Sequence, residues 1–181
     1  MALVKSFAPL VSPGARILIL GSMPGEASLK AHQYYAHPQN QFWKIMERLI
    51  GVDRQFPYAK RVRLIQDNNI AMWDVLQYCE REGSLDSAIF NEIANDFNGL
   101  IRNHPSIRHV FFNGGKAESA FNKLVKPTLN ASDLEFTRLP STSPAHASRN
   151  FEEKCAAWSV ILNFLSADRI EITGQRARNL L

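Results

Sequence analysis

The chain has 181 residues, of which 45% are hydrophobic and 21% charged, and its formal net charge is +4. This composition is typical of a globular protein and is sufficient for one domain with its own core. The positive charge suits a polyanionic partner, because lysines and arginines that neutralise phosphates release counterions. No apolar run is long enough to span a bilayer and no secretory signal opens the chain, so we expect a cytoplasmic protein, associated with the nucleoid in a prokaryote.

The two cysteines, Cys79 and Cys155, stand far apart and form no Cys-x-x-Cys pair. Their spacing argues against a disulfide scaffold, a zinc site and an iron–sulfur cluster. We therefore expect no metal and no cofactor.

In chain order, a short apolar run at residues 16–20 predicts a buried strand, and a long loop rich in Gly, Pro, Ser, Tyr and His follows it to residue 40. Apolar residues at helical spacing predict a helix over 42–50 that stops at Gly51. A second helix is expected at 58–66 and a second strand at 70–73.

The second half of the chain continues the alternation. We expect a helix over 89–102, a strand at 109–112, a helix at 116–124, a strand at 134–139 and a last helix over 150–165. This order predicts an α/β fold of three layers, α/β/α, with a central four-stranded parallel sheet. Residues 1–165 would form the single domain, and residues 166–181 a loosely ordered tail. Ligands of such folds bind beyond the carboxyl ends of the strands.

The turn after the first strand has the sequence GSMPG, residues 21–25. Two glycines and a proline let the backbone approach a ligand closely and hold the turn rigid. The same residues are also compatible with a tight turn that binds nothing.

A second polar motif, YYAHPQNQFW, spans residues 34–43. Two exposed tyrosines in a loop favour stacking on a base. Asn40 stands where a helix begins, so it either caps that helix or points its carboxamide into a pocket. Phe42 and Trp43 are expected in the core.

A third motif, PSTSPAHASR, spans residues 140–149 and precedes the last helix. Its small hydroxyl side chains and the helix terminus are suited to donating hydrogen bonds to phosphates. A solvated turn has the same composition, and His146 taken alone is typical of a surface histidine.

Together with MWDVL at residues 72–76, these motifs resemble the uracil-DNA glycosylase superfamily, over about residues 16–165. Their sequence is most similar to the hypoxanthine-DNA glycosylase branch, also called the DNA-deoxyinosine glycosylases. The resemblance implies a uracil-DNA glycosylase-like fold and a monofunctional enzyme of base-excision repair. Such an enzyme flips a deaminated base, with hypoxanthine favoured, out of double-stranded DNA and hydrolyses its N-glycosidic bond. We expect it to act as a monomer.

The resemblance also implies roles for individual residues. Tyr35 would stack on the flipped base, although Tyr34 is an alternative. Uracil-active relatives carry Asp or Asn where this chain has Met23, and Asn40 would then orient the attacking water. Asp74 would accept the N1–H of hypoxanthine, or only cap the loop that follows it. The implied base pocket comprises Gly21, Ser22, Met23, Pro24, Gly25, Tyr35, His37 and Asp74. The implied DNA-binding residues are Ser141, Ser143, Pro144, Ala145, His146, Ser148 and Arg149.

No lysine of these motifs is placed to form a Schiff base, so we expect no lyase step. Two alternatives stay open: a uracil or thymine mismatch glycosylase, and a catalytically inactive DNA-damage-binding module of the same fold. A flavodoxin-like enzyme is disfavoured, because no phosphate-binding glycine-rich helix start follows the first strand.

Overall fold

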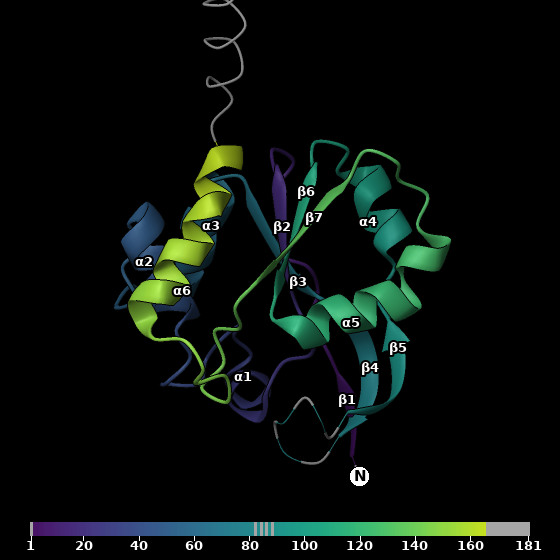
Figure 1. The fold of residues 1–181 in the computed structure, drawn as a ribbon, viewed down its shortest axis with the longest axis horizontal. Helices are drawn as coiled ribbons and strands as arrows, with labels where there is room; N and C mark the ends of the chain where they lie inside the picture. Colours follow the sequence, from purple (N-terminus) through teal and green to yellow (C-terminus); the bar gives the residue numbers. More distant parts are fainter. Residues whose placement is uncertain (1, 82, 84, 86, 88, 166–181) are drawn as a thin grey trace, which may run out of the picture.

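The computed structural model describes residues 2–81, 83, 85, 87 and 89–165, and a four-stranded parallel sheet lies at its centre (Figure 1). The sheet has the order β3-β2-β6-β7, and all neighbours in it are parallel. Its strands are β2 (Ile17–Gly21), β3 (Ile70–Asp74), β6 (His109–Asn113) and β7 (Glu135–Leu139). The predicted four-stranded parallel sheet is confirmed, and each strand begins and ends within one residue of the predicted range.

Alternate residues of the sheet point into two separate cores, because successive side chains of a strand face opposite ways. Leu18 and Leu20 face the core under α4 (Phe97–Asn103) and α5 (Gly115–Leu124). Ile17 and Ile19 face the opposite core. That second core is covered by α2 (Phe42–Ile50), α3 (Tyr58–Asp67) and α6 (Phe151–Trp158). The sheet therefore lies between two helical layers, as predicted (Figure 1).

A second, antiparallel sheet was not predicted. It has the order β1-β4-β5 and consists of β1 (Ala2–Lys5), β4 (Leu76–Arg81) and β5 (Phe90–Ala94). The helix predicted over 89–102 is wrong in its first half, where β5 pairs with β4 instead. Only the second half is helical, as α4, and the side chain of Asp96 caps it by accepting the N–H of Gly99 at 2.9 Å. Pairing between distant strands overrode a local helical pattern here.

Three smaller features differ from the prediction. The loop after β2 contains a short helix, α1 (Glu26–Ala31). After α5 the chain makes the 3₁₀ turn η2 (Lys126–Thr128). The last predicted helix is α6 followed by the 3₁₀ helix η3 (Ser159–Phe164). The predicted tail, 166–181, lies outside the described residues. Among the described residues, no helix is long and apolar enough to cross a membrane.

Candidate active site

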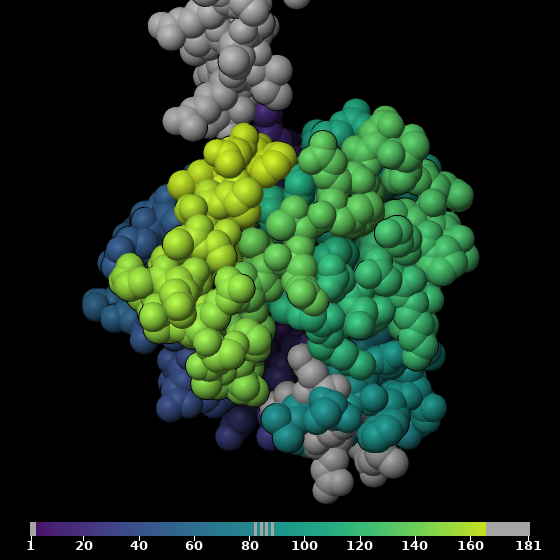
Figure 2. All heavy atoms as spheres, viewed as in Figure 1, coloured from purple at the N-terminus to yellow at the C-terminus, as the bar shows by residue number. Residues whose placement is uncertain are grey.

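A cavity of about 360 Å³ lies beyond the carboxyl ends of the parallel strands. Figure 2 shows the hollow between the yellow-green segment that precedes α6 and the green α5, with purple amino-terminal atoms at its floor. The loops that follow β2, β6 and β7 contribute to its lining, together with the last residue of β3 and the segment before α2. The lining includes residues 21–25, 34, 35, 37, 40, 74, 113–116 and 141–146. Its volume is in the range of small-molecule sites.

The floor of the cavity joins Gly21 to Asp74, which are paired in the β2–β3 ladder. A Cβ atom on Gly21 would lie 2.6 Å from Oδ1 of Asp74 and 3.7 Å from the hydroxyl of Tyr35. Only glycine lets the buried carboxylate lie against the backbone here. Met23 lines the same cavity, but only 7% of the residue is exposed, and the rest packs among the apolar residues under α4 and α5.

Tyr34, which we expected to be exposed, is buried, and this prediction is wrong. Its hydroxyl donates to the carbonyl of Ala8 at 3.3 Å. Its backbone N–H donates to the Tyr58 hydroxyl, and its carbonyl accepts the Trp43 indole N–H, both at 3.0 Å. Tyr34 is therefore held as a structural support at the edge of the cavity.

Tyr35 adopts a left-handed backbone conformation with φ of 56°, which is rare for a bulky residue. Its ring stacks on Phe42 with centroids 4.0 Å apart, which covers one face of the ring, and the residue lines the cavity. The hydroxyl is buried and makes no hydrogen bond of ordinary length and angle with a described residue. Burial, together with the nearby charge of Asp74, raises the pKa of this phenol.

Of the two roles left open for Asn40, the helix cap is not its own, because Gln41 stands at the N-cap of α2 and no side chain caps the helix there. The Oδ1 of Asn40 accepts the N–H of Phe42 at 3.0 Å, and the same side chain lines the cavity. The Nδ2 group makes no hydrogen bond with any described residue, so it is free to hold water or a base. Phe42 and Trp43 are buried, as predicted.

The 141–149 loop, between β7 and α6, forms the wall opposite these residues. Five of its seven predicted DNA-binding residues line the cavity: Ser141, Ser143, Pro144, Ala145 and His146. The other two do not. Ser148 bonds to the His146 imidazole at 3.1 Å, and Arg149 lines a neighbouring hollow.

The loop after β6 was missed by the sequence analysis, although residues 113–116 line the cavity. Gly114 has a φ of +97°, and a Cβ atom there would lie 2.8 Å from that of Ser141. The sequence analysis took Gly114 and Gly115 only as a stop to the strand. The rule that ligands gather at the carboxyl ends of parallel strands was the signal that could have placed this loop in the site.

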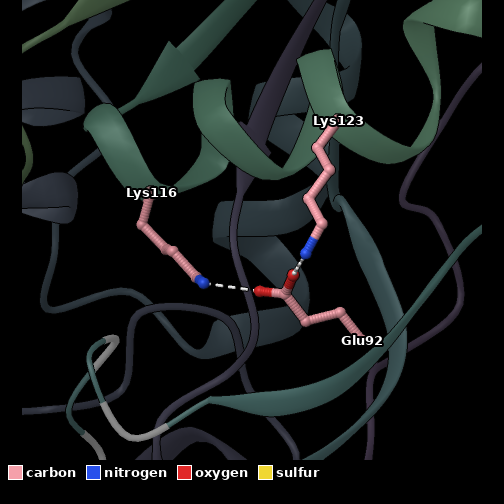
Figure 3. A network of polar contacts seen from close by, with 3 residues as sticks. All are labelled: Glu92, Lys116 and Lys123. Atoms are coloured by element: carbon pink, nitrogen blue, oxygen red, sulfur yellow. Dashed lines mark hydrogen bonds and ion pairs between the residues drawn. The ribbon is translucent and has the colours of Figure 1, made fainter.

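Lys116, in the first turn of α5, also lines the cavity. Its ammonium group is paired with the carboxylate of Glu92 (Figure 3). Glu92 of β5 accepts hydrogen bonds from Lys116 at 2.5 Å and from Lys123 at 3.2 Å. Burial favours a raised pKa for the Glu92 carboxyl, but the two lysines outweigh it and hold the pKa below its usual range. Among the described residues, no group of three His, Cys, Asp or Glu side chains is arranged to hold a metal ion.

This chain belongs to the uracil DNA glycosylase superfamily, whose family model matches residues 8–166. The resemblance drawn from the motifs is thereby confirmed.

Individual relatives agree with this assignment. The chain is 36% identical over 156 residues to a hypoxanthine DNA glycosylase of Methanosarcina barkeri, an alignment that covers 86% of this chain and 95% of the relative. It is 37% identical over 156 residues to a protein of the same name from Methanosarcina acetivorans, covering 84% and 96%. A solution NMR structure of a candidate uracil DNA glycosylase from Methanosarcina acetivorans superposes with a TM-score of 0.72 at 34% identity, covering 87% of this chain and 98% of that one.

Proposed function

We propose that this protein is a monofunctional DNA glycosylase that removes a deaminated base, hypoxanthine favoured, from double-stranded DNA and leaves an abasic site. The observation that carries the proposal is the cavity itself. It is lined by Tyr35, Asp74 and Asn40 and by the hydroxyl-rich loop that precedes α6. Two relatives that align over most of the chain are named for this activity. The protein acts as a monomer in the cytoplasm, at the nucleoid in a prokaryote.

The base must leave the duplex before it can enter this cavity, which costs a few kcal/mol, and less for a mispaired base. Inside, the base lies on the face of Tyr35 that Phe42 leaves uncovered. Asp74, at the floor, accepts the N1–H of hypoxanthine. The loop residues Ser141 and Ser143 contact the phosphates of the strand that delivers the base.

Cleavage of the N-glycosidic bond passes through an oxocarbenium-like sugar and expels the base with its bonding electrons. Gly115 and Lys116 begin α5 at the cavity, so the backbone N–H groups and the positive end of the helix stabilise the negative charge on the leaving base. Asn40 orients the water that attacks C1′ of the sugar, and the proton that this water loses neutralises the base that left as an anion. The side chain of Met23 offers only a thioether sulfur, a weak acceptor with no donor, and is poorly suited to position a water in its place.

Release assays on matched duplexes that carry hypoxanthine, uracil, xanthine or a methylated base test this proposal. Abasic sites are converted to strand breaks by heat and alkali and counted on a gel. Preferential nicking at hypoxanthine is the expected result. Preferential nicking at uracil would make the protein a mismatch uracil glycosylase. Binding to the lesion without nicking would make it a damage-binding module.

A further inference from the structure

A second hollow, of about 490 Å³, adjoins the active-site cavity. The two share Ser143, Pro144 and His146 as a common wall. The second hollow is bounded by residues 38–44 before and within α2, by residues 143–149 of the loop, and by α6. It therefore lies immediately beside the active-site cavity.

The lining of this hollow is basic. It includes Lys44, Arg149 and Lys154, and no aspartate or glutamate. Neither Lys44 nor Arg149 makes an ion pair or a side-chain hydrogen bond with a described residue. The nearby carboxylates of α6 are already occupied: that of Glu152 by Arg48, and that of Glu153 by the backbone N–H of Asn150. Three cations therefore share one hollow without an anion.

Lys154 is the most unusual of the three, because only 2% of the residue is exposed. Its ammonium group donates to the carbonyl of His146 at 2.8 Å, which uses one of its three N–H groups. A buried ammonium group is costly unless it is paired and fully hydrogen-bonded. Burial accordingly lowers the pKa of Lys154. An anion in the hollow would supply the missing acceptors.

We propose that this hollow is a phosphodiester subsite, in which Lys44, Arg149 and Lys154 bind a DNA backbone phosphate that flanks the extruded nucleotide. The proposal rests on the proposed function, since it requires DNA to be the ligand of the adjoining cavity. A strand whose base enters the cavity passes over the shared wall at Ser143 and His146, so its neighbouring phosphates come within reach of the hollow. The contact fixes the register of the strand and carries no sequence information.

The test is the salt dependence of DNA binding, measured by fluorescence anisotropy with a hypoxanthine-bearing duplex and the full chain. Lys44→Ala and Arg149→Ala should each lower the slope of log affinity against log salt by about 0.9, the value for one phosphate contact. The matched control is Arg102→Ala. Arg102 is exposed at the end of α4, which covers the other face of the sheet from α2 and α6, and its substitution should leave the slope unchanged.

Lys154→Met removes the buried charge and should lower the slope by a similar amount, but it also releases the carbonyl of His146. The two other variants leave that bond in place and therefore keep the proposal testable if Lys154→Met fails to fold. An unchanged slope in both Lys44→Ala and Arg149→Ala would overturn the proposal.

Two further arms separate the possible causes of failure. Base release with unaltered slopes would retain the glycosylase and reject the subsite. Lowered slopes without base release would retain the subsite and reject the glycosylase. Titration with inorganic phosphate alone tests whether the hollow binds a free anion instead. If phosphate binding saturates in the wild type and is lost in Lys44→Ala, while the salt slope of DNA binding is the same in both, the hollow is a site for a small anion. That result would overturn the proposal.

Discussion

Asn113 and Thr142 are joined by two reciprocal hydrogen bonds that tie the end of β6 to the 141–149 loop. The Oδ1 of Asn113 accepts the N–H of Thr142 at 2.8 Å, and its Nδ2 donates to the Thr142 hydroxyl at 2.9 Å. The carbonyl of Thr142 in turn accepts the N–H of Gln41 at 3.0 Å, next to the start of α2. Thr142 is fully buried. One residue pair therefore fixes three walls of the cavity.

Replacing Asn113 by Ala should weaken both the fold and the catalysis. It leaves the buried N–H of Thr142 without its acceptor, which costs about 1–3 kcal/mol of unfolding free energy. Base release should fall by up to about 100-fold, because small displacements of positioning groups have effects of that size. Denaturant unfolding and single-turnover release measure the two losses. Asn113→Asp keeps an acceptor for Thr142 and should recover most of the stability. Unchanged stability in the Ala variant would show that the junction contributes nothing.

Asn40 requires a prediction that separates the two ends of its carboxamide. Asn40→Ala should reduce base release by about 10²–10³-fold, the range for removal of one positioned polar group. It should also lower stability by about 1 kcal/mol, because the N–H of Phe42 loses its acceptor. Asn40→Ser offers another acceptor to Phe42 but lacks the Nδ2 group, so it should restore stability without restoring single-turnover release. A Ser variant with most of the wild-type rate would limit Asn40 to its hydrogen bond with Phe42.

The parallel sheet could be predicted because strands covered on both faces leave continuous apolar runs, such as residues 17–20. The antiparallel sheet could not. In β5 both Phe90 and Ile93 are exposed, and their spacing of three residues imitates a helical stripe. Only pairing with β4, itself paired with β1 from the start of the chain, makes this segment a strand. No local pattern carries that information.

The candidate site divides in the same way. The turn at residues 21–25 and the 141–149 loop have compositions that point to ligands, and both line the cavity. The residues around Asn113 in the sequence do not have a composition that points to a ligand. Asn113 belongs to the site because β6 lies between β2 and β7 in the sheet. The reverse holds for Arg149, which belongs to a recognisable motif and yet lies outside the cavity. Strand order decides membership in the site, and sequence motifs predict it only in part.

His109, at the opposite end of β6 from Asn113, should make stability depend on pH. Burial lowers its pKa, against the raising effect of the Glu135 carboxylate 3.3 Å away. A histidine with a lowered pKa binds fewer protons when folded, so stability should fall as the pH drops through its unfolded value of about 6.5. Denaturant unfolding between pH 8 and pH 5 measures this. His109→Gln should be less stable at pH 8 but show a flatter profile; a profile as steep as that of the wild type would contradict the assignment.

Tyr35 provides the sharpest test of the base pocket, because its ring and its hydroxyl make separate contacts. Tyr35→Ala removes the stacking surface, which is worth about 1–3 kcal/mol per base. Base release should therefore fall by roughly one to two decades, since about 1.4 kcal/mol corresponds to a factor of ten. Tyr35→Phe keeps the ring on Phe42 and removes a buried hydroxyl that has no hydrogen bond of ordinary geometry, so it should stay close to wild type in rate.

Tyr34 is the matched control for this comparison. Tyr34→Phe loses a hydrogen bond to the carbonyl of Ala8 and should lower stability by about 1 kcal/mol while leaving single-turnover release nearly unchanged. A larger loss of release at Tyr34 than at Tyr35 would transfer the stacking role to Tyr34. Equal losses of base release for Tyr35→Phe and Tyr35→Ala would show instead that the site uses the hydroxyl, which lies beside Gly21 and the charge of Asp74. The base would then not bind on the face of the Tyr35 ring opposite Phe42.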